Sequence, residues 1–260
     1  MRLEQARACI LRAGGTNCDL EVKVALEALG LGTDVLHMNQ LGRLSDYQML
    51  IFPGGFSYGD YVRAGAIWGK EVYSKLGREL EDFVDDGKLV LGICNGFQVL
   101  VESGLLPGNG AGGVPTAALA NNTSAKYECR WIRLKVERCK SPFAGSFQPG
   151  DAIRMPIGHG EGRFLLRSED DLNELVKGDQ VVFRYAMPDG NYADGRYPHN
   201  PNGSLFDIAA ICNKRGNVMG MMPHPERAFF GWQLPERLTK PERADGSRIF
   251  MGAIEYLKKY

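Results

Sequence analysis

A cysteine lies in the pattern Gly-x-Cys-x-Gly, between an apolar run typical of a buried strand and an apolar helix pattern. Cys94 follows the run at 88–93 and precedes a helix expected over 96–103, within Gly92-Ile93-Cys94-Asn95-Gly96. Glycines on both sides of a nucleophile permit a tight strand-to-helix turn that lifts the side chain above the sheet. The start of the helix also favours a thiolate. The pattern therefore predicts a nucleophile, with an ordinary buried cysteine as the alternative.

A histidine and a glutamate suited to assist such a cysteine lie near the end of the chain. His224 and Glu226 belong to the run MMPHPERAF, and their spacing of two puts both on one side of an extended segment. Pro223 and Pro225 stiffen the backbone on both sides of the imidazole. The chemistry of acyl transfer needs a base and a group that orients it, so we expect His224 as base and Glu226 as its partner. Without Cys94, the pair would instead favour a surface histidine in a proline-rich turn, with a solvated glutamate.

The third run is a Pro-Gly-Gly turn after the strand pattern at 48–52. Gly54 and Gly55 leave main-chain N–H groups open to a ligand, which an oxyanion hole beside a thiolate requires. The N–H of Asn95, the residue after the nucleophile, is the natural second donor. By itself this run is compatible with a simple turn.

The elements that must position these residues alternate between strands and helices in the first half of the chain. This rhythm predicts an α/β fold, flavodoxin-like, with a mostly parallel, doubly wound sheet, helices on both faces, and ligands at the carboxyl ends of the strands. The expected strands are 8–11, 33–38, 48–52 and 88–93, and the expected helices are 19–29, capped by Asp19, then 64–86 and 96–103.

From about residue 110 the pattern changes to short strands separated by turns, which indicates added antiparallel strands. A long irregular loop is expected over 188–203, where Pro, Asn and Gly are frequent. The expected strands are 130–136, 181–186, 208–213 and 218–222, followed by a helix at 247–258. Since no linker divides the chain, we expect one domain over 1–260.

Composition excludes several classes of function. The 260 residues contain 31 Lys and Arg against 31 Asp and Glu, so no basic surface favours nucleic acid or acidic lipid. The apolar runs are too short to span a membrane, and the residues after Met1 do not resemble an export signal, so a cytoplasmic location is expected. The six cysteines include no CxxC pair, and neither a metal site nor a disulfide framework is expected.

Taken together, the three runs resemble the class I, triad-type glutamine amidotransferases. The order is a strand followed by PGG, then G-x-C-x-G-x-Q, then a distal H-P-E. More narrowly, the chain is similar to the glutaminase subunits of phosphoribosylformylglycinamidine synthases, through PGGFSYGDYVRAGAIW, GICNGFQVLVESGLLPG, PIGHGEGRF and MMPHPERAF. The resemblance runs from Ala13 to the terminal helix. The segment 231–243 looks like an insertion.

The resemblance implies a role for each matching residue. Cys94 would attack the side-chain amide of glutamine, His224 would protonate the leaving ammonia and then activate water, and Glu226 would hold His224. The N–H groups of Gly55 and Asn95 would stabilise the oxyanion. The substrate site would include Gly54, Gln98, His159, Gly160 and Glu161, of which the last three resemble a loop that meets the glutamine α-groups or the partner.

The resemblance also implies a partner. No GxxxxGK[ST] run is present, and no glycine run with a basic partner that could cradle phosphates. No cofactor is therefore expected in this chain, and ATP and Mg²⁺ are expected on a separate synthetase subunit that uses the ammonia to convert formylglycinamide ribonucleotide to formylglycinamidine ribonucleotide. A small third subunit is compatible with this scheme.

Two alternatives stay open at this point. The chain could be another cysteine-dependent hydrolase of the same fold, or a regulatory subunit without turnover; His224 and Glu226 argue against both. Cys18, near the start of the first expected helix, is a much weaker candidate for catalysis than Cys94.

Overall fold

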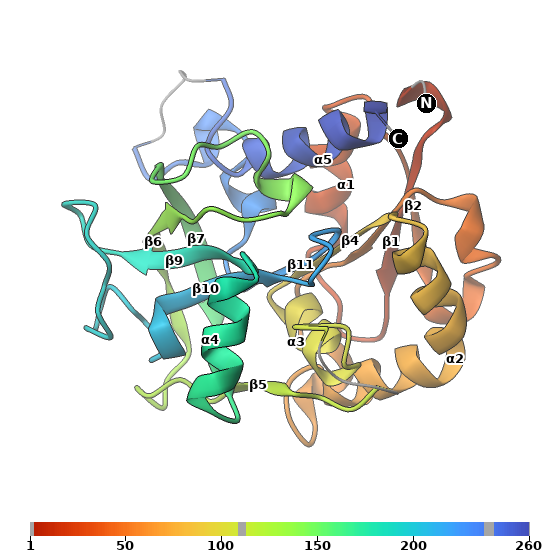
Figure 1. Ribbon diagram of the computed structural model, residues 1–260. Coiled ribbons are helices and arrows are strands. Elements are labelled where there is room, and N and C mark those ends of the chain that lie inside the picture. The colour runs from red at the N-terminus through yellow and green to blue at the C-terminus, as the bar shows by residue number, and fades with distance from the viewer. Residues whose placement is uncertain (1–2, 109–112, 237–241, 260) are drawn as a thin grey trace.

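The computed structural model describes residues 3–108, 113–236 and 242–259 (Figure 1). The expected single domain over 1–260 therefore includes residues outside this description, and it stays a prediction. Among the described helices, none combines the length and the apolar character needed to span a membrane.

Five parallel strands form one half of a nine-stranded sheet. In spatial order they are β2 (Gly32–His37), β1 (Arg7–Arg12), β3 (Met49–Phe52), β4 (Leu89–Ile93) and β11 (Val218–Met221). The residues of β3, β4 and β11 are all buried, as expected for parallel strands covered on both faces. This half has the flavodoxin-like strand order, which confirms the expected α/β fold. Its last strand comes from the far end of the sequence.

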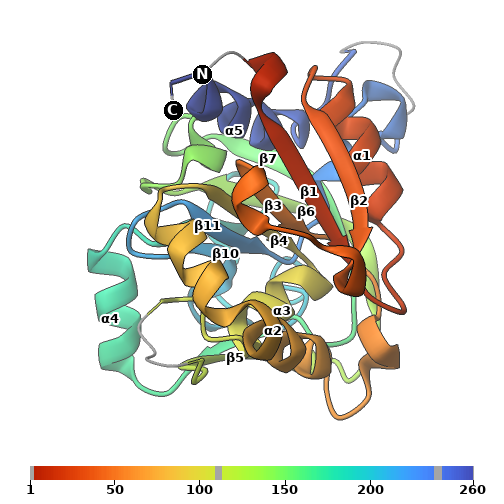
Figure 2. The same cartoon turned by 90° about the vertical axis from the view of Figure 1, so that its right-hand side faces the viewer.

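Helices cover both faces of the parallel half (Figures 1 and 2). α1 (Asp19–Glu27) and α5 (Ser247–Lys259) lie together on one face, and α2 (Ala66–Asp85) and α3 (Asn95–Glu102) lie together on the other. These elements and the expected strands agree with the sequence prediction to within two residues at each end. The expected cap is wrong: Asp19 is the first helical residue, and Cys18 precedes it without a side-chain capping bond.

Antiparallel strands complete the sheet, in the order β10 (Ile208–Cys212), β9 (Val181–Ala186), β6 (Glu128–Val136) and β7 (Ala152–His159). β5 (Ala117–Ala120) and β8 (Arg163–Leu166) form a separate two-stranded sheet. The expected antiparallel addition is confirmed. β5, β7, β8 and α4 (Glu169–Lys177) were not anticipated. α4 buries only Leu175, but its sequence carries helix signals that were overlooked: Ser168 is its N-cap, and Leu172, Leu175 and Val176 lie at helical spacing.

Short 3-10 turns connect several of these elements. They are Leu3–Gln5, Met38–Gln40, Leu44–Asp46, Ser57–Asp60, Pro142–Ala144, Leu205–Asp207, Pro225–Ala228 and Gly231–Gln233. The expected irregular loop over 188–203 contains no helix or strand.

The sheet is curved so that its edge strand β7 returns to the parallel half. β7 is four strands away from β11, yet the N–H of His224, just after β11, donates to the Pro156 carbonyl of β7 at 2.9 Å. The carboxyl ends of β3, β4 and β11 therefore face the end of β7 across one site.

Candidate active site

Cys94 occupies a strained turn between β4 and α3. Its backbone angles are φ 51° and ψ −106°, a conformation that non-glycine residues adopt only when their surroundings impose it. A Cβ on Gly96 would lie 1.8 Å from the Phe52 carbonyl oxygen, and one on Gly92 would lie 2.6 Å from that of Gly96. Both glycines are therefore required sterically, as expected for a nucleophile elbow. The Cys94 N–H donates to Met221 at 2.7 Å, which ties the turn to β11.

His224 and Glu226 form a buried pair just beyond β11. Nδ1 of His224 lies 2.6 Å from Oε1 of Glu226, and the two side chains are 3 % and 0 % exposed. Nε2 has no hydrogen-bond partner among the described residues, so it is free to exchange a proton with a substrate or water. Burial alone lowers the pKa of His224, but the Glu226 carboxylate and then the Cys94 sulfur outweigh it and hold that pKa well above its ordinary value. The same attraction favours an imidazolium beside a negatively charged sulfur.

The two glycines after β3 play different parts. A Cβ on Gly54 would lie 2.8 Å from Cε1 of His224 and 3.0 Å from the Cys18 sulfur, so the missing side chain leaves room for the imidazole. Gly55, at φ 150°, would bring a Cβ to 2.6 Å from the Gly15 oxygen. Within the described chain, the N–H groups of Gly55 and Asn95 have no acceptor, as an oxyanion hole requires.

Most of the expected site residues line one cavity of about 180 Å³. It is lined by Gly55, Phe56, Asp60, Ala64, Cys94, Gln98, Tyr127, Gly158, His159, Gly160 and Glu161. Gly54, expected to contact the substrate, does not line it. A larger cavity of about 340 Å³ lies beside α2, but its described lining has no cysteine or histidine. The smaller cavity, which contains Cys94 in its wall, is therefore the candidate active site.

His159 is the last residue of β7 rather than part of a loop, and it is buried. Its Nδ1 lies 3.2 Å from Oδ1 of Asn122, an oxygen that also accepts from the Gly162 N–H at 3.0 Å. That contact assigns the ring proton to Nδ1 and leaves Nε2, which has no described partner, as an acceptor. Burial and then the charge of His224 lower the pKa of His159 to about 3. A ring this resistant to protonation is suited to binding substrate and not to moving protons at neutral pH.

Gln98 supports the cavity wall with both ends of its amide. Its Oε1 accepts from Nδ2 of Asn95 at 2.9 Å, and its Nε2 donates to the Glu161 carbonyl at 2.6 Å. Asn95 also uses its Oδ1 to accept from the Ser57 N–H at 3.0 Å. These bonds join the elbow, the turn after β3 and the 160–162 segment. Gln98 thus shapes the pocket while its own polar atoms are already paired.

A pair of carboxylates lies at one wall of the cavity. Glu161 accepts from the Ala64 N–H at 3.0 Å. Burial and then the charge of Glu161 raise the pKa of Asp60 to about 6. Gly160 has no atom within 4 Å of a Cβ position, so nothing in the protein requires a glycine there and the space belongs to the cavity. Asp60 and Tyr127, which also line the cavity, were not predicted as site residues; Asp60 lies in the run PGGFSYGDYVRAGAIW, but only its two glycines, Gly54 and Gly55, were given roles.

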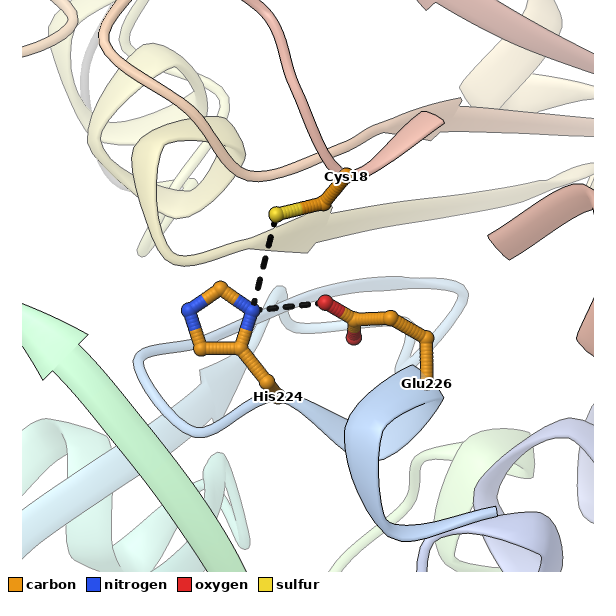
Figure 3. A group of neighbouring side chains, drawn as sticks. All are labelled: Cys18, His224 and Glu226. Atoms are coloured by element: carbon orange, nitrogen blue, oxygen red, sulfur yellow. Dashed lines mark hydrogen bonds and ion pairs between the residues drawn. The ribbon is translucent and has the colours of Figure 1, made fainter. Parts of the chain in front are cut away.

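Cys18 lies beside His224, a contact that the sequence did not predict. Its sulfur lies 4.0 Å from Nδ1 of His224 (Figure 3). It also lies 3.1 Å from Nη2 of Arg227. Burial raises the pKa of the Cys18 thiol despite the nearby imidazole, which agrees with its ranking as a much weaker candidate for catalysis than Cys94. The sequence held no signal for this contact, since 206 residues separate Cys18 from His224.

The described part of the segment 231–243 braces the turn that carries Glu226. Oε1 of Gln233 accepts from the N–H groups of Phe229 and Phe230, both at 2.8 Å, and its Nε2 donates to the Glu226 carbonyl at 3.0 Å. Residues 237–241 lie outside the described chain.

Comparison with known proteins agrees with this geometry. Residues 5–257 match the family of CobB/CobQ-like glutamine amidotransferase domains. Phosphoribosylformylglycinamidine synthase subunit PurQ of Archaeoglobus fulgidus is 44 % identical over the whole of both chains, and that of Dehalococcoides mccartyi is 40 % identical over 99 % of this chain and 100 % of the relative. The chain belongs to the PurQ family of glutamine amidotransferases.

Solved structures of relatives have the same fold. A chain in the structure of PurLQS from Thermotoga maritima is 36 % identical, with a TM-score of 0.76 over 97 % of this chain and 99 % of that one. The glutaminase domain of Trypanosoma brucei CTPS, with bound acivicin, is 14 % identical with a TM-score of 0.52, over 96 % of this chain and 94 % of that one. The second likeness concerns the fold alone.

Proposed function

We propose that this chain is the glutaminase subunit of a phosphoribosylformylglycinamidine synthase, acting in purine biosynthesis. The observation that carries the proposal is the convergence of Cys94 at a strained elbow with the buried His224–Glu226 pair, beside a cavity of about 180 Å³. PurQ relatives 38–44 % identical to this chain support the choice of reaction. A cytoplasmic location is part of the proposal.

The chemistry follows from the positions of the groups. The Cys94 thiolate attacks the side-chain amide carbon of glutamine, and the N–H groups of Gly55 and Asn95 stabilise the resulting oxyanion. The carbon–nitrogen bond then breaks as His224 gives its Nε2 proton to the leaving ammonia, and a thioester remains on Cys94. His224 next takes a proton from water, whose oxygen attacks the thioester and releases glutamate. Glu226 keeps the imidazole oriented throughout.

The cavity wall selects the other end of the substrate. The Asp60 and Glu161 carboxylates lie where they attract the α-ammonium group of glutamine, and Nε2 of His159 is free to accept a hydrogen bond from it. Gly160 leaves the space that this end of the substrate occupies.

The partner is a synthetase subunit that binds ATP and Mg²⁺ and receives the ammonia. Exposed apolar side chains beside the cavity suit such a partner: Tyr61 and Val62 are 75 % and 85 % exposed, and Phe56 and Tyr127 pair at the rim with ring centroids 6.2 Å apart. Tyr58, Asp60 and Val62 all have positive φ, so this loop is held in a strained form. Docking against it is expected to adjust the neighbouring Gly55 and so to raise glutaminase turnover.

The docking surface can be tested with one charge. Val62→Asp is expected to weaken binding to the synthetase by at least about tenfold, because it puts an unpaired charge into an apolar contact. Val176→Asp, an exposed apolar position on α4, is the matched control. The measurement is calorimetric titration of each variant with the synthetase subunit. Equal affinities for both variants would place the partner on another surface.

The function is tested with a glutamine-mimicking diazoketone and with ammonia. The reagent should attach one adduct per chain at Cys94, found by peptide mass mapping. Cys94→Ala should abolish glutamine-dependent synthesis in the reconstituted complex and leave synthesis from added ammonium salt intact. An adduct at Cys18 or Cys139 instead would contradict the assignment of the nucleophile. Loss of the ammonia-dependent reaction would contradict the division of labour between the subunits.

A further inference from the structure

Three potential metal ligands converge at the Nδ1 side of the His224 imidazole. They are the Cys18 sulfur, Nδ1 of His224 and a carboxylate oxygen of Glu226, all within 4.8 Å of one another (Figure 3). The figure shows the sulfur and the carboxylate approaching the same ring nitrogen from two directions. A second observation favours a ligand here: Oε2 of Glu226 is buried and has no hydrogen-bond partner in the described chain.

The geometry is close to that of a zinc site. Zinc–ligand distances of 2.0–2.3 Å in a tetrahedron put neighbouring donor atoms roughly 3.3–3.7 Å apart. Here Nδ1 lies 4.0 Å from the Cys18 sulfur and 2.6 Å from Oε1 of Glu226, so small side-chain rotations reach the required spacing. Thiolate, imidazole and carboxylate together are a donor set that Zn²⁺ and Co²⁺ accept readily.

We infer that Cys18, His224 and Glu226 form a binding site for Zn²⁺ or a similar divalent ion, and that its occupation switches the glutaminase off. Binding releases the Cys18 thiol proton and the Nδ1 proton of the His224 imidazolium to solvent, and water completes the coordination. The imidazole then uses Nδ1 for the metal and keeps its one proton on Nε2. An imidazole whose Nδ1 binds a metal and whose Nε2 already carries a proton cannot accept a proton from Cys94 or from water.

Arg227 opposes the metal and so limits its affinity. Its Nη2 lies 3.1 Å from the Cys18 sulfur and 3.4 Å from Oε1 of Glu21, and its side chain is 40 % exposed. The guanidinium must turn toward solvent when the metal binds, and its charge still repels the ion. The site is therefore suited to reversible regulation by metal availability and not to permanent occupation.

Binding is tested without turnover, in the full-length Cys94→Ala chain, which removes the other thiolate near His224. Titration with Co²⁺ should produce a thiolate-to-cobalt absorption band that saturates at one equivalent. Adding Cys18→Ser should abolish the band, whereas adding Cys129→Ser, which changes an exposed cysteine, should leave it unchanged. A band that survives Cys18→Ser, or that disappears with Cys129→Ser, would overturn the site.

A second variant tests the site independently if Cys18→Ser fails to fold. In the Cys94→Ala chain, Arg227→Met should tighten Co²⁺ binding roughly tenfold, because one nearby positive charge is removed. Unchanged or weaker binding in a variant with the parent's circular dichroism spectrum would count against the site.

The regulatory consequence rests on the proposed function, and the binding does not. In the reconstituted synthase, Zn²⁺ should inhibit synthesis from glutamine and spare synthesis from ammonia. With Cys18→Ser, the inhibiting Zn²⁺ concentration should rise at least about tenfold, the effect of one lost ligand. Equal sensitivity of the two proteins would refute the switch. Failure of the glutaminase reaction itself, with Co²⁺ still bound through Cys18, would instead refute the proposed function alone.

Discussion

The two halves of the nine-stranded sheet contribute to the site in different ways. The parallel half supplies the groups that make and break bonds: β3 leads to Gly55, β4 to Cys94 and β11 to His224. The antiparallel half supplies the wall that faces them, through His159 at the end of β7 and the residues that follow it, and Asp60 from the loop after β3 completes this wall. Chemistry placed at the ends of adjacent parallel strands is fixed by the sheet itself. The substrate wall depends on the curvature that brings β7 back to β11.

The difference predicts that changes in the parallel half lower turnover, and the largest effect is expected at the base. His224→Ala should lower kcat by about 10⁴-fold, since no neighbouring group can move the proton in its place. Glu226→Gln should lower it less, because the imidazole loses its orientation and charge partner but is still present. Steady-state glutaminase kinetics in the complex give both values. Near-normal turnover in His224→Ala would show that another residue is the base. It would also contradict the assignment of catalysis to the parallel half of the sheet.

Changes in the antiparallel half are expected to affect binding instead. His159→Gln should raise KM for glutamine by about tenfold and leave kcat within a few-fold of the parent, because the cavity loses a fixed acceptor. His199→Gln is the control, because His199 does not line the cavity. A fall in kcat as large as that of His224→Ala would show that β7 takes part in proton transfer.

The pH dependence separates recognition from catalysis. Asp60 has a pKa of about 6 in the folded protein, above its ordinary value, so it is charged above that pH and neutral below it. If its carboxylate attracts the α-ammonium, kcat/KM for glutamine should fall severalfold as the pH drops through 6. Asp60→Asn should have the lower value throughout and lack this step. A profile that keeps the step in Asp60→Asn would assign it to another group.

The smallest effect is expected at Gln233, whose hydrogen bonds hold the turn that carries Glu226 after β11. Gln233→Ala should lower kcat by about three- to tenfold without changing KM, since the Glu226 turn loses three hydrogen bonds and shifts the imidazole. Gln233→Glu keeps an acceptor for two of these bonds and should recover part of the activity. Thermal unfolding of both variants checks that the fold persists. A change in KM alone would contradict a positioning role.

Local sequence determined the parts of this protein that depend on local geometry. The glycines around Cys94 predict the elbow because only glycine fits against the Phe52 carbonyl there. The pairing of His224 with Glu226 was expected, but its geometry differs from the extended segment assumed for it, because Glu226 lies in the 3-10 turn Pro225–Ala228. The parallel strands were predictable because they are short buried apolar runs. α4 was missed although its sequence carries helix signals, with Ser168 as N-cap and Leu172, Leu175 and Val176 at helical spacing.

Tertiary structure decided which distant residues share the site. The sequence cannot show that β11 inserts beside β4, that β7 curves back to face His224, or that Cys18 lies 4.0 Å from Nδ1 of His224. These contacts join residues up to 206 positions apart, and they result from strand order and sheet curvature rather than from any spacing along the chain. For the same reason the pKa of His159 and that of Asp60 follow from burial and neighbouring charge, neither of which exists before the sheet closes.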